Sequence, residues 1–580
     1  MGTAVHMVLV VCFMLFGQTL TISDPDLQQR LRDLDTFIQT LMTCESRPVV
    51  GLTVSVVKDG ETIFAKGYGQ RDLQTGQAVD NTTLFGVGSI SKSFTTALLA
   101  AILGEREDVN WDTVLTDILG PDFRFRDEFR TKETTLRDIL AHKTGLENIL
   151  ENPAFTVGQD YDRSELARRM RYLRQIYPFR TVWHYNNDLY TLAGHVAEKL
   201  TGKSWEALLR ERVLGPLGMD DTVYLEDVLD DESFSNLAQT YLTYNRTGQS
   251  VAYSHDEFRP ITLHNPAGGV VSNALDMARY MNFQLSGGKN AAGRLVAPED
   301  TLRHTHVAEF TSSFDPDKLE PDWPVEAGTE QGYGLAWFVG TYRGYRRLQH
   351  SGFVAGYVSL LSLYPAASGG VFTSVNGPNS FTDDAAIDVH DMIHALVGDI
   401  VTGKAHWLND TIACTYPEPW LTRPKYNSTV PPEISDNFPR DKRDYEGVYG
   451  NRAAGNLTIS LNTTDDNLYL SFGVIGRGLV LPSTSPNRLL LRLQGPLEYL
   501  PLVIADVGEK DGRIFSLSLH RFPPEPALLF ERGLKLTDPD PTLPKWDDCT
   551  GVSGSPSGSS PSSIFVVLFC MASVYMTTMV

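Results

Sequence analysis

The spacing of apolar residues predicts a helix and then a β-hairpin near the start of the chain. Within residues 26–43, Leu, Ile and Phe recur every three or four positions, and Asp24-Pro25 is a typical helix start. Residues 49–58 and 61–67 read as two strands around an Asp59-Gly60 turn. Further helices are predicted at 95–103, within 136–150 and after the polar segment 184–188, and two strands flank a glycine-rich bend within 347–364.

The pattern changes character after about residue 405. Residues 405–440 are rich in Pro, Asn and Thr, which indicates a linker. Residues 441–535 alternate short apolar runs with turn residues, so we predict a small antiparallel β domain or barrel there. Its expected strands are 457–461, 468–472, 489–493, 514–519 and 527–531.

Both ends of the chain have the composition of processing signals. The apolar run 8–16 predicts a secretory signal peptide over residues 1–22, although only His6 stands in the basic segment before it, so a signal anchor is the alternative. Residues 536–563 read as a flexible stalk. The apolar residues 564–580 match either a GPI-attachment signal or a short membrane segment. We therefore expect a secreted protein or one anchored on the extracellular face of the plasma membrane.

Glycosylation sequons and cysteines fit a secretory route. The N-x-[ST] sequons are Asn81, Asn245, Asn409, Asn427, Asn456 and Asn462. Outside the two terminal signals the cysteines are Cys44, Cys414 and Cys549, which allow one disulfide whose partners the sequence does not identify.

Composition narrows the function classes. The chain has 580 residues, 42% of them apolar and 21% charged, which suits a globular protein of two domains. Its net charge of −21 argues against nucleic acid and anionic membrane surfaces as partners. The sequence has no metal-spaced Cys/His cluster, so we expect neither a metal nor a cofactor.

Candidate chemistry centres on the tetrad Ser89-Ile90-Ser91-Lys92. Glycines precede it and a helix-forming run follows, so Lys92 is expected one turn after Ser89 on the same helix face. A serine hydroxyl is a poor nucleophile unless a neighbour takes its proton, and an unprotonated lysine amine can do so.

Two other S-x-x-K tetrads and one K-T-G tripeptide fit this chemistry less well. Ser55 and Lys58 lie in an expected strand, where positions i and i+3 point to opposite faces. The tetrad at 286–289 is a turn by composition, and the tripeptide at 143–145 follows a helix rather than opening a strand.

Together with Tyr185-x-Asn187 and His350-x-Gly352, the Ser89 tetrad resembles the three motifs of the serine β-lactamase and penicillin-binding-protein family, in its class C-related branch. Further stretches are similar to the family over roughly 45–400: L-A-H-K-T-G-L at 140–146, the helix ending in P-L-G-M at 216–219, and P-A-G-G-V-V-S at 266–272. The resemblance implies an α/β (α+β) fold, an antiparallel sheet flanked by helices plus an all-helical region, over residues 23–404.

The resemblance also implies roles for individual residues. Ser89 would attack a carbonyl, with Lys92 and Tyr185 sharing the general-base role. Asn187 would hold Lys92 or a substrate amide, and the backbone N–H groups of Ser89 and Phe353 would meet the oxyanion.

His350 stands where many β-lactamases have a lysine, and a histidine is mostly neutral at pH 7. This favours an esterase or peptidase acting on a small-molecule or peptide substrate over a true β-lactamase. For Asn187, a helix cap is the structural alternative. For the whole chain, the alternative is a catalytically inactive surface binding module of the same fold.

Overall fold

The computed structural model describes most of the chain, and the two terminal signals lie outside the described residues. The described ranges are 24–149, 161–230, 234, 236–243, 250–254, 262–311, 323–325, 328–354, 356–379, 385–421, 434–473, 476–498, 500–521, 524–535 and 538. The predicted signal peptide, nearly all of the stalk, the C-terminal tail, Cys549 and the sequons at Asn245 and Asn427 therefore fall outside them. Within the described part, no helix is long and apolar enough to cross a membrane.

A nine-stranded antiparallel sheet forms the centre of the first domain. Its strand order is β3-β2-β1-β14-β13-β12-β11-β10-β9, so strands from both ends of the domain meet in the middle of the sheet. The predicted hairpins at 49–67 and 347–364 are present as β1–β2 and β12–β13. The strands are β1 (Gly51–Lys58), β2 (Glu61–Asp72), β3 (Gln77–Ala78), β9 (Phe310–Thr311), β10 (Thr329–Tyr333), β11 (Phe338–Tyr342), β12 (Tyr345–Val354), β13 (Tyr357–Tyr364) and β14 (Gly369–Val375).

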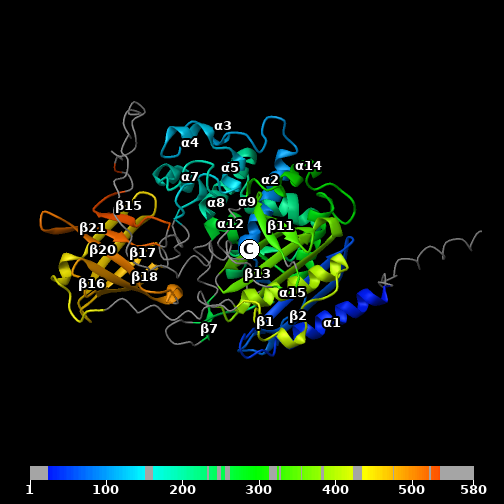
Figure 1. Ribbon diagram of the computed structural model, residues 1–580. Coiled ribbons are helices and arrows are strands. Elements are labelled where there is room, and N and C mark those ends of the chain that lie inside the picture. The colour runs from blue at the N-terminus through cyan, green and yellow to red at the C-terminus, as the bar shows by residue number, and fades with distance from the viewer. Residues whose placement is uncertain are drawn as a thin grey trace, which may run out of the picture.

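Helices cover both faces of this sheet (Figure 1). The predicted N-terminal helix is α1 (Pro25–Leu41), and it packs with α15 (Ala385–Thr402) on one face. Strand β1 shows the pleat directly, since Leu52, Val54 and Val56 join the α1–α15 core and Val57 joins the opposite one. On that opposite face lies α13 (Ala274–Leu285), which contains Tyr280 as predicted.

A mainly helical region adjoins the sheet and carries α2 (Ser91–Leu103), a fully buried helix. Short strands tie the region together: β4 (Phe85–Gly86), β5 (Val223–Tyr224) and β8 (Val270–Ser272) pair, as do β6 (Thr240–Thr243) and β7 (Ser250–Tyr253). The other helices are α3 (Leu115–Leu119), α4 (Glu128–Glu133), α5 (Leu136–Leu140), α7 (Arg163–Arg169), α8 (Asn187–Thr201), α9 (Trp205–Leu209), α10 (Gly215–Leu217), α11 (Asp227–Asp230), α12 (Asn265–Gly268) and α14 (Glu299–Thr305).

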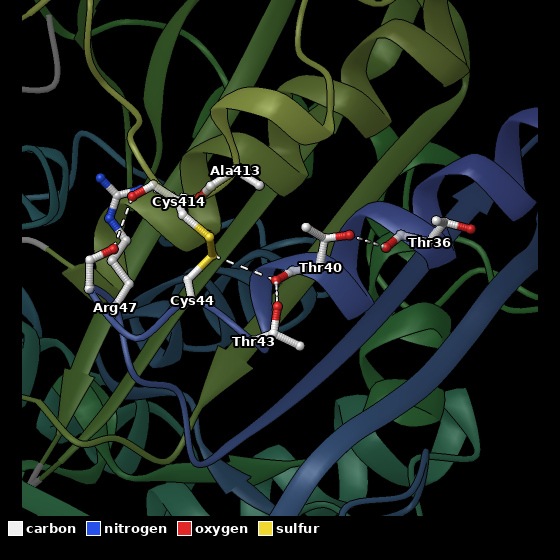
Figure 2. The surroundings of a disulfide bond; sticks show 8 residues. Thr36, Thr40, Thr43, Cys44, Arg47, Ala413 and Cys414 are labelled. Atoms are coloured by element: carbon white, nitrogen blue, oxygen red, sulfur yellow. Dashed lines mark hydrogen bonds between the residues drawn. A yellow bond between two sulfur atoms is a disulfide. The ribbon is translucent and has the colours of Figure 1, made fainter.

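The first half of the predicted linker belongs to the first domain. Cys414 forms a disulfide with Cys44, just after α1, with 5.3 Å between their Cα atoms (Figure 2). Leu408 and Ala413 are buried in the core shared with α1 and α15. The proline and asparagine content of this segment predicts a linker, but apolar residues within it are buried in a core. Within the predicted linker 405–440, Leu408, Ala413 and Cys414 thus pack with or bond to the first domain.

The second domain is a closed eight-stranded antiparallel barrel, as the alternating pattern predicted (Figure 1). Its strands are β15 (Gly447–Asn451), β16 (Gly455–Asn462), β17 (Asn467–Phe472), β18 (Gly476–Pro482), β19 (Arg488–Leu493), β20 (Val503–Lys510), β21 (Arg513–Leu519) and β22 (Leu528–Arg532). Closure leaves no free strand edge within the barrel. The sequons Asn409, Asn456 and Asn462 are exposed and Asn81 is half-buried, so glycosylation stays a prediction at these sites.

Candidate active site

Ser89 lies in a single 3₁₀ turn, Gly88–Ile90, which runs directly into α2. The preceding Gly88 has φ +53°, a left-handed conformation that glycine adopts without strain. A Cβ on Gly88 would also come within 2.5 Å of the Phe353 backbone nitrogen on β12. Glycine at this position thus sets the sharp entry to α2 and lets β12 approach the serine.

Lys92 follows Ser89 by one turn and is fully buried. Its Nζ lies 3.0 Å from Ser89 Oγ, 2.6 Å from Asn187 Oδ1 and 2.8 Å from the carbonyl oxygen of Ala267. Burial lowers the pKa of the Lys92 amine well below its ordinary value, because a charge in the interior loses its hydration.

The three neighbours of Lys92 suit a neutral amine. A neutral amine has two N–H donors and one lone pair. Those two donors match the oxygens of Asn187 and Ala267, and the lone pair then faces the hydroxyl of Ser89. The same three oxygens could also accept from the three donors of an ammonium, so it is burial that favours the neutral form, the one that can accept a proton from Ser89.

Tyr185, which lies two residues before α8, reaches the same serine. Its hydroxyl lies 2.8 Å from Ser89 Oγ, and its ring lies 4.7 Å from Lys92 Nζ. Asn187 is the first residue of α8, and the side chain of Asn186 supplies the cap by accepting from the backbone N–H of Leu189. Asn186 rather than Asn187 therefore caps the helix. The side-chain amide of Asn187 binds Lys92 instead.

His350 is buried on β12, beside this group. Its Nδ1–H donates to the carbonyl oxygen of Ser351 at 2.6 Å, so its Nε2 accepts from the Tyr333 hydroxyl at 3.2 Å. Burial and the nearby Lys92 amine lower the pKa of His350 to about 3, so the ring is neutral at physiological pH.

Gly352 and Phe353 bring strand β12 against the turn that precedes Ser89. A Cβ on Gly352 would lie 2.0 Å from the carbonyl oxygen of Val87, so a larger residue would push the strand away. The Phe353 side chain is 37% exposed, and its backbone nitrogen faces Gly88. The structure thus brings the seven predicted active-site residues, Ser89 among them, into one group.

Aromatic residues that the motifs did not reveal complete the surroundings. His142 packs against the Tyr185 ring, with 4.5 Å between ring centroids, and its Nδ1 accepts from the Asn186 backbone N–H at 3.0 Å. Trp183 and Tyr333 pack together beside them, at 5.5 Å. The similar stretches 140–146 and 266–272 were the available signal, since they contain His142 and Ala267.

The competing motifs lie elsewhere. Lys58 Nζ donates to the Ala367 carbonyl oxygen at the end of β1, and Ser286 Oγ donates to the Lys289 carbonyl oxygen in a surface turn. Lys143 pairs with Glu309 at 3.6 Å instead of approaching Ser89.

Known proteins share this architecture. The model of the family described as Beta-lactamase matches residues 34–395. An unguisins hydrolase of Aspergillus campestris is 29% identical over 440 residues, which are 73% of this chain and 76% of the relative. A D-aminopeptidase of Brucella anthropi is 30% identical over 206 residues, 34% of this chain and 36% of the relative. The octameric penicillin-binding protein homologue of Pyrococcus abyssi has a similar fold, with a TM-score of 0.52 at 20% identity over 86% of this chain and all of that chain.

Proposed function

The chain belongs to the Beta-lactamase family of serine hydrolases, and we propose that it is secreted or held at the cell surface, where it cleaves an ester or amide through an acyl-enzyme on Ser89. The observation that carries the acyl-enzyme is the position of Ser89 Oγ, 2.8 Å from the Tyr185 hydroxyl and 3.0 Å from the Lys92 amine. Both distances are within reach for proton transfer.

Acylation begins when Ser89 Oγ attacks the substrate carbonyl carbon. The serine proton passes to the Lys92–Tyr185 pair, and the carbonyl electrons move onto the oxygen. The backbone N–H groups of Ser89 and Phe353 would stabilise that oxyanion, and one such donor is typically worth a factor of about 10²–10³ in rate. When the intermediate collapses, the pair returns a proton to the departing alcohol or amine.

Deacylation repeats the sequence with water as the nucleophile. The same pair takes a proton from water, the ester bond to Ser89 breaks, and the acid is released as Ser89 regains its proton. Asn187 takes part by fixing the direction of the Lys92 lone pair through its 2.6 Å hydrogen bond.

A substrate without an essential carboxylate suits the site. Burial lowers the pKa of His350 to about 3, so the ring is neutral at physiological pH and offers no positive charge to a substrate carboxylate. One relative is named a D-aminopeptidase, which supports an amide or D-amino-acyl substrate for this chain as well. The disulfide and the predicted terminal signals support the extracellular location.

Turnover by Ser89→Ala tests the proposal. Chromogenic short-chain esters, a cephalosporin and a D-amino-acid amide serve as substrates, and a fluorophosphonate probe reports the nucleophile. We expect the variant to lose turnover and labelling. The control Ser286→Ala, in the exposed S-x-x-K tetrad at 286–289, should keep both. Unchanged turnover in Ser89→Ala would remove Ser89 from the mechanism, and a folded wild-type protein without label would instead indicate a binding module.

A further inference from the structure

A cluster of buried charged side chains joins the barrel to the first domain. Two of its members, Arg521 and Glu525, come from the connection between β21 and β22 and are 8% and 6% exposed. Glu147 of the first domain is 2% exposed and faces them. Charged groups are rarely buried without close partners, so this contact is specific.

Glu525 binds the first domain at two points. One carboxylate oxygen lies 2.7 Å from His184 Nε2, and both oxygens lie 3.2 Å from the backbone nitrogen of Asn148. The Arg521 guanidinium donates to the Glu525 carboxylate at 2.8 Å. It also donates to the Glu147 carboxylate and to the Asn148 carbonyl oxygen. Hydrogen bonds to a charged group are stronger than those between neutral groups, so the contact fixes both His184 and Asn148.

These two residues hold the segment just before α8 that carries Tyr185. His184 is its neighbour in the chain, and the Asn148 side-chain amide donates to the Tyr185 carbonyl oxygen at 3.1 Å. On the other side, the Asn186 amide donates to the Glu147 carbonyl oxygen at 3.0 Å. Residues 184–186 are therefore connected to the barrel through the His184 side chain and through Asn148 and Glu147.

We propose that Glu525 is a positioning residue for Tyr185, so that the barrel is part of the active-site framework; this role rests on the proposed function of Ser89 and Tyr185. The carboxylate fixes the backbone from which the Tyr185 hydroxyl reaches Ser89 at 2.8 Å. A displacement of about 1 Å in a reacting group can cost a factor of about 10² in rate.

A double-mutant cycle in the full-length chain separates positioning from mere attachment of the barrel. The variants are Glu525→Gln, Tyr185→Phe and both together, and the measurement is the rate at which a fluorophosphonate probe labels the folded protein. We expect Glu525→Gln to slow labelling about 10- to 100-fold in the wild-type background and less than about twofold when Tyr185 is already Phe.

Arg169→Gln is the matched control. Arg169 also joins the two domains, by donating to the Ala453 carbonyl oxygen of the barrel at 3.3 Å, but within the described residues its hydrogen-bond and ion-pair partners do not include residues 184–186. We expect its labelling rate to stay within about twofold of wild type. If Glu525→Gln does not fold, Glu525→Asp takes its place in the cycle, since it keeps the charge but shortens its reach.

Equal slowing by the Glu525 variant in both backgrounds, or no slowing in either, would overturn the positioning role. The labelled residue is identified by peptide mass spectrometry. Label on a residue other than Ser89 would refute the proposed function itself. Label on Ser89 together with additive effects would refute the role of Glu525 alone.

Discussion

At the scale of single residues, Lys92 shows how burial can select a protonation state. Water no longer hydrates its amine, and the two carbonyl oxygens beside it use the donors that a neutral amine has. The sequence placed Lys92 beside Ser89 through helical spacing alone. Spacing could not pair Lys92 with the Ala267 carbonyl oxygen, which is 175 residues away in the chain, and only the similarity of residues 266–272 to the family pointed to that segment.

Replacing Lys92 with Met tests its role as a base. We expect kcat to fall by a factor of about 10²–10⁴, since a positioned base typically contributes that much. The thermal midpoint should not fall, because the variant no longer buries an amine. Steady-state kinetics and thermal unfolding check the two outcomes, with Lys289→Met as an exposed control. Activity within tenfold of wild type would show that another group takes the proton.

The pH dependence of kcat/KM follows from the same two residues. Lys92 must be neutral to act, so activity should rise with pH through its lowered pKa, well below the ordinary value of 10.5. His350, with a pKa of about 3, stays neutral between pH 5 and 8 and should add no step there. In His350→Asn the level of activity changes while the midpoint of the acid limb stays. If the fall in kcat/KM at acid pH disappears in this variant, the group that titrates there is His350 instead of Lys92.

At the scale of elements, the start of α8 divides three tasks among neighbouring polar residues. Asn186 caps the helix, Asn187 reaches Lys92, and Asp188 accepts from the backbone N–H of Ile149 at 3.3 Å. The sequence predicted the helix and a polar cap. It could not distinguish Asn186 from Asn187, because either asparagine can cap a helix. Only the folded chain shows that Lys92 of α2 lies beside Asn187.

Asp188→Asn tests the electrostatics of this element. Burial raises the pKa of Asp188 to about 7, above its ordinary 3.8. Its stabilising contribution is therefore complete below about pH 4 and is lost as the pH rises through about 7. The asparagine variant cannot ionise, so its stability relative to wild type should increase between pH 5 and 8 in urea unfolding. A stability difference between the variant and wild type that decreases over this range would contradict the raised pKa of Asp188. Asp410→Asn, on the surface, is the control.

At the scale of the whole molecule, local patterns predicted the parts but not their contacts. Alternation found five of the eight barrel strands, yet it missed β15, β18 and β20, where glycines or charged residues interrupt the apolar positions. The contact of Glu525 with His184 spans 341 residues, and the disulfide spans 370. Neither a spacing rule nor composition can identify such partners, since only the folded chain brings them together.

The disulfide should stabilise the first domain by closing a long loop between α1 and residue 414. Replacing both Cys44 and Cys414 with Ser should lower the free energy of unfolding by about 2–4 kcal/mol. Denaturant unfolding of the full chain measures this change, with Cys549→Ser as the matched control. If the double variant is as stable as wild type, or if the Cys549 variant loses as much, the Cys44–Cys414 pair is not the stabilising bond.

The most direct test of the central claim is a mass measurement on the trapped acyl-enzyme. The protein is quenched in acid during turnover of a slowly released cephalosporin or ester, and its peptides are mapped. The account predicts one acyl group on the peptide that contains Ser89, absent from Ser89→Ala, which no longer turns over the substrate. An acyl group on another residue, or turnover by Ser89→Ala at the wild-type rate, would contradict it.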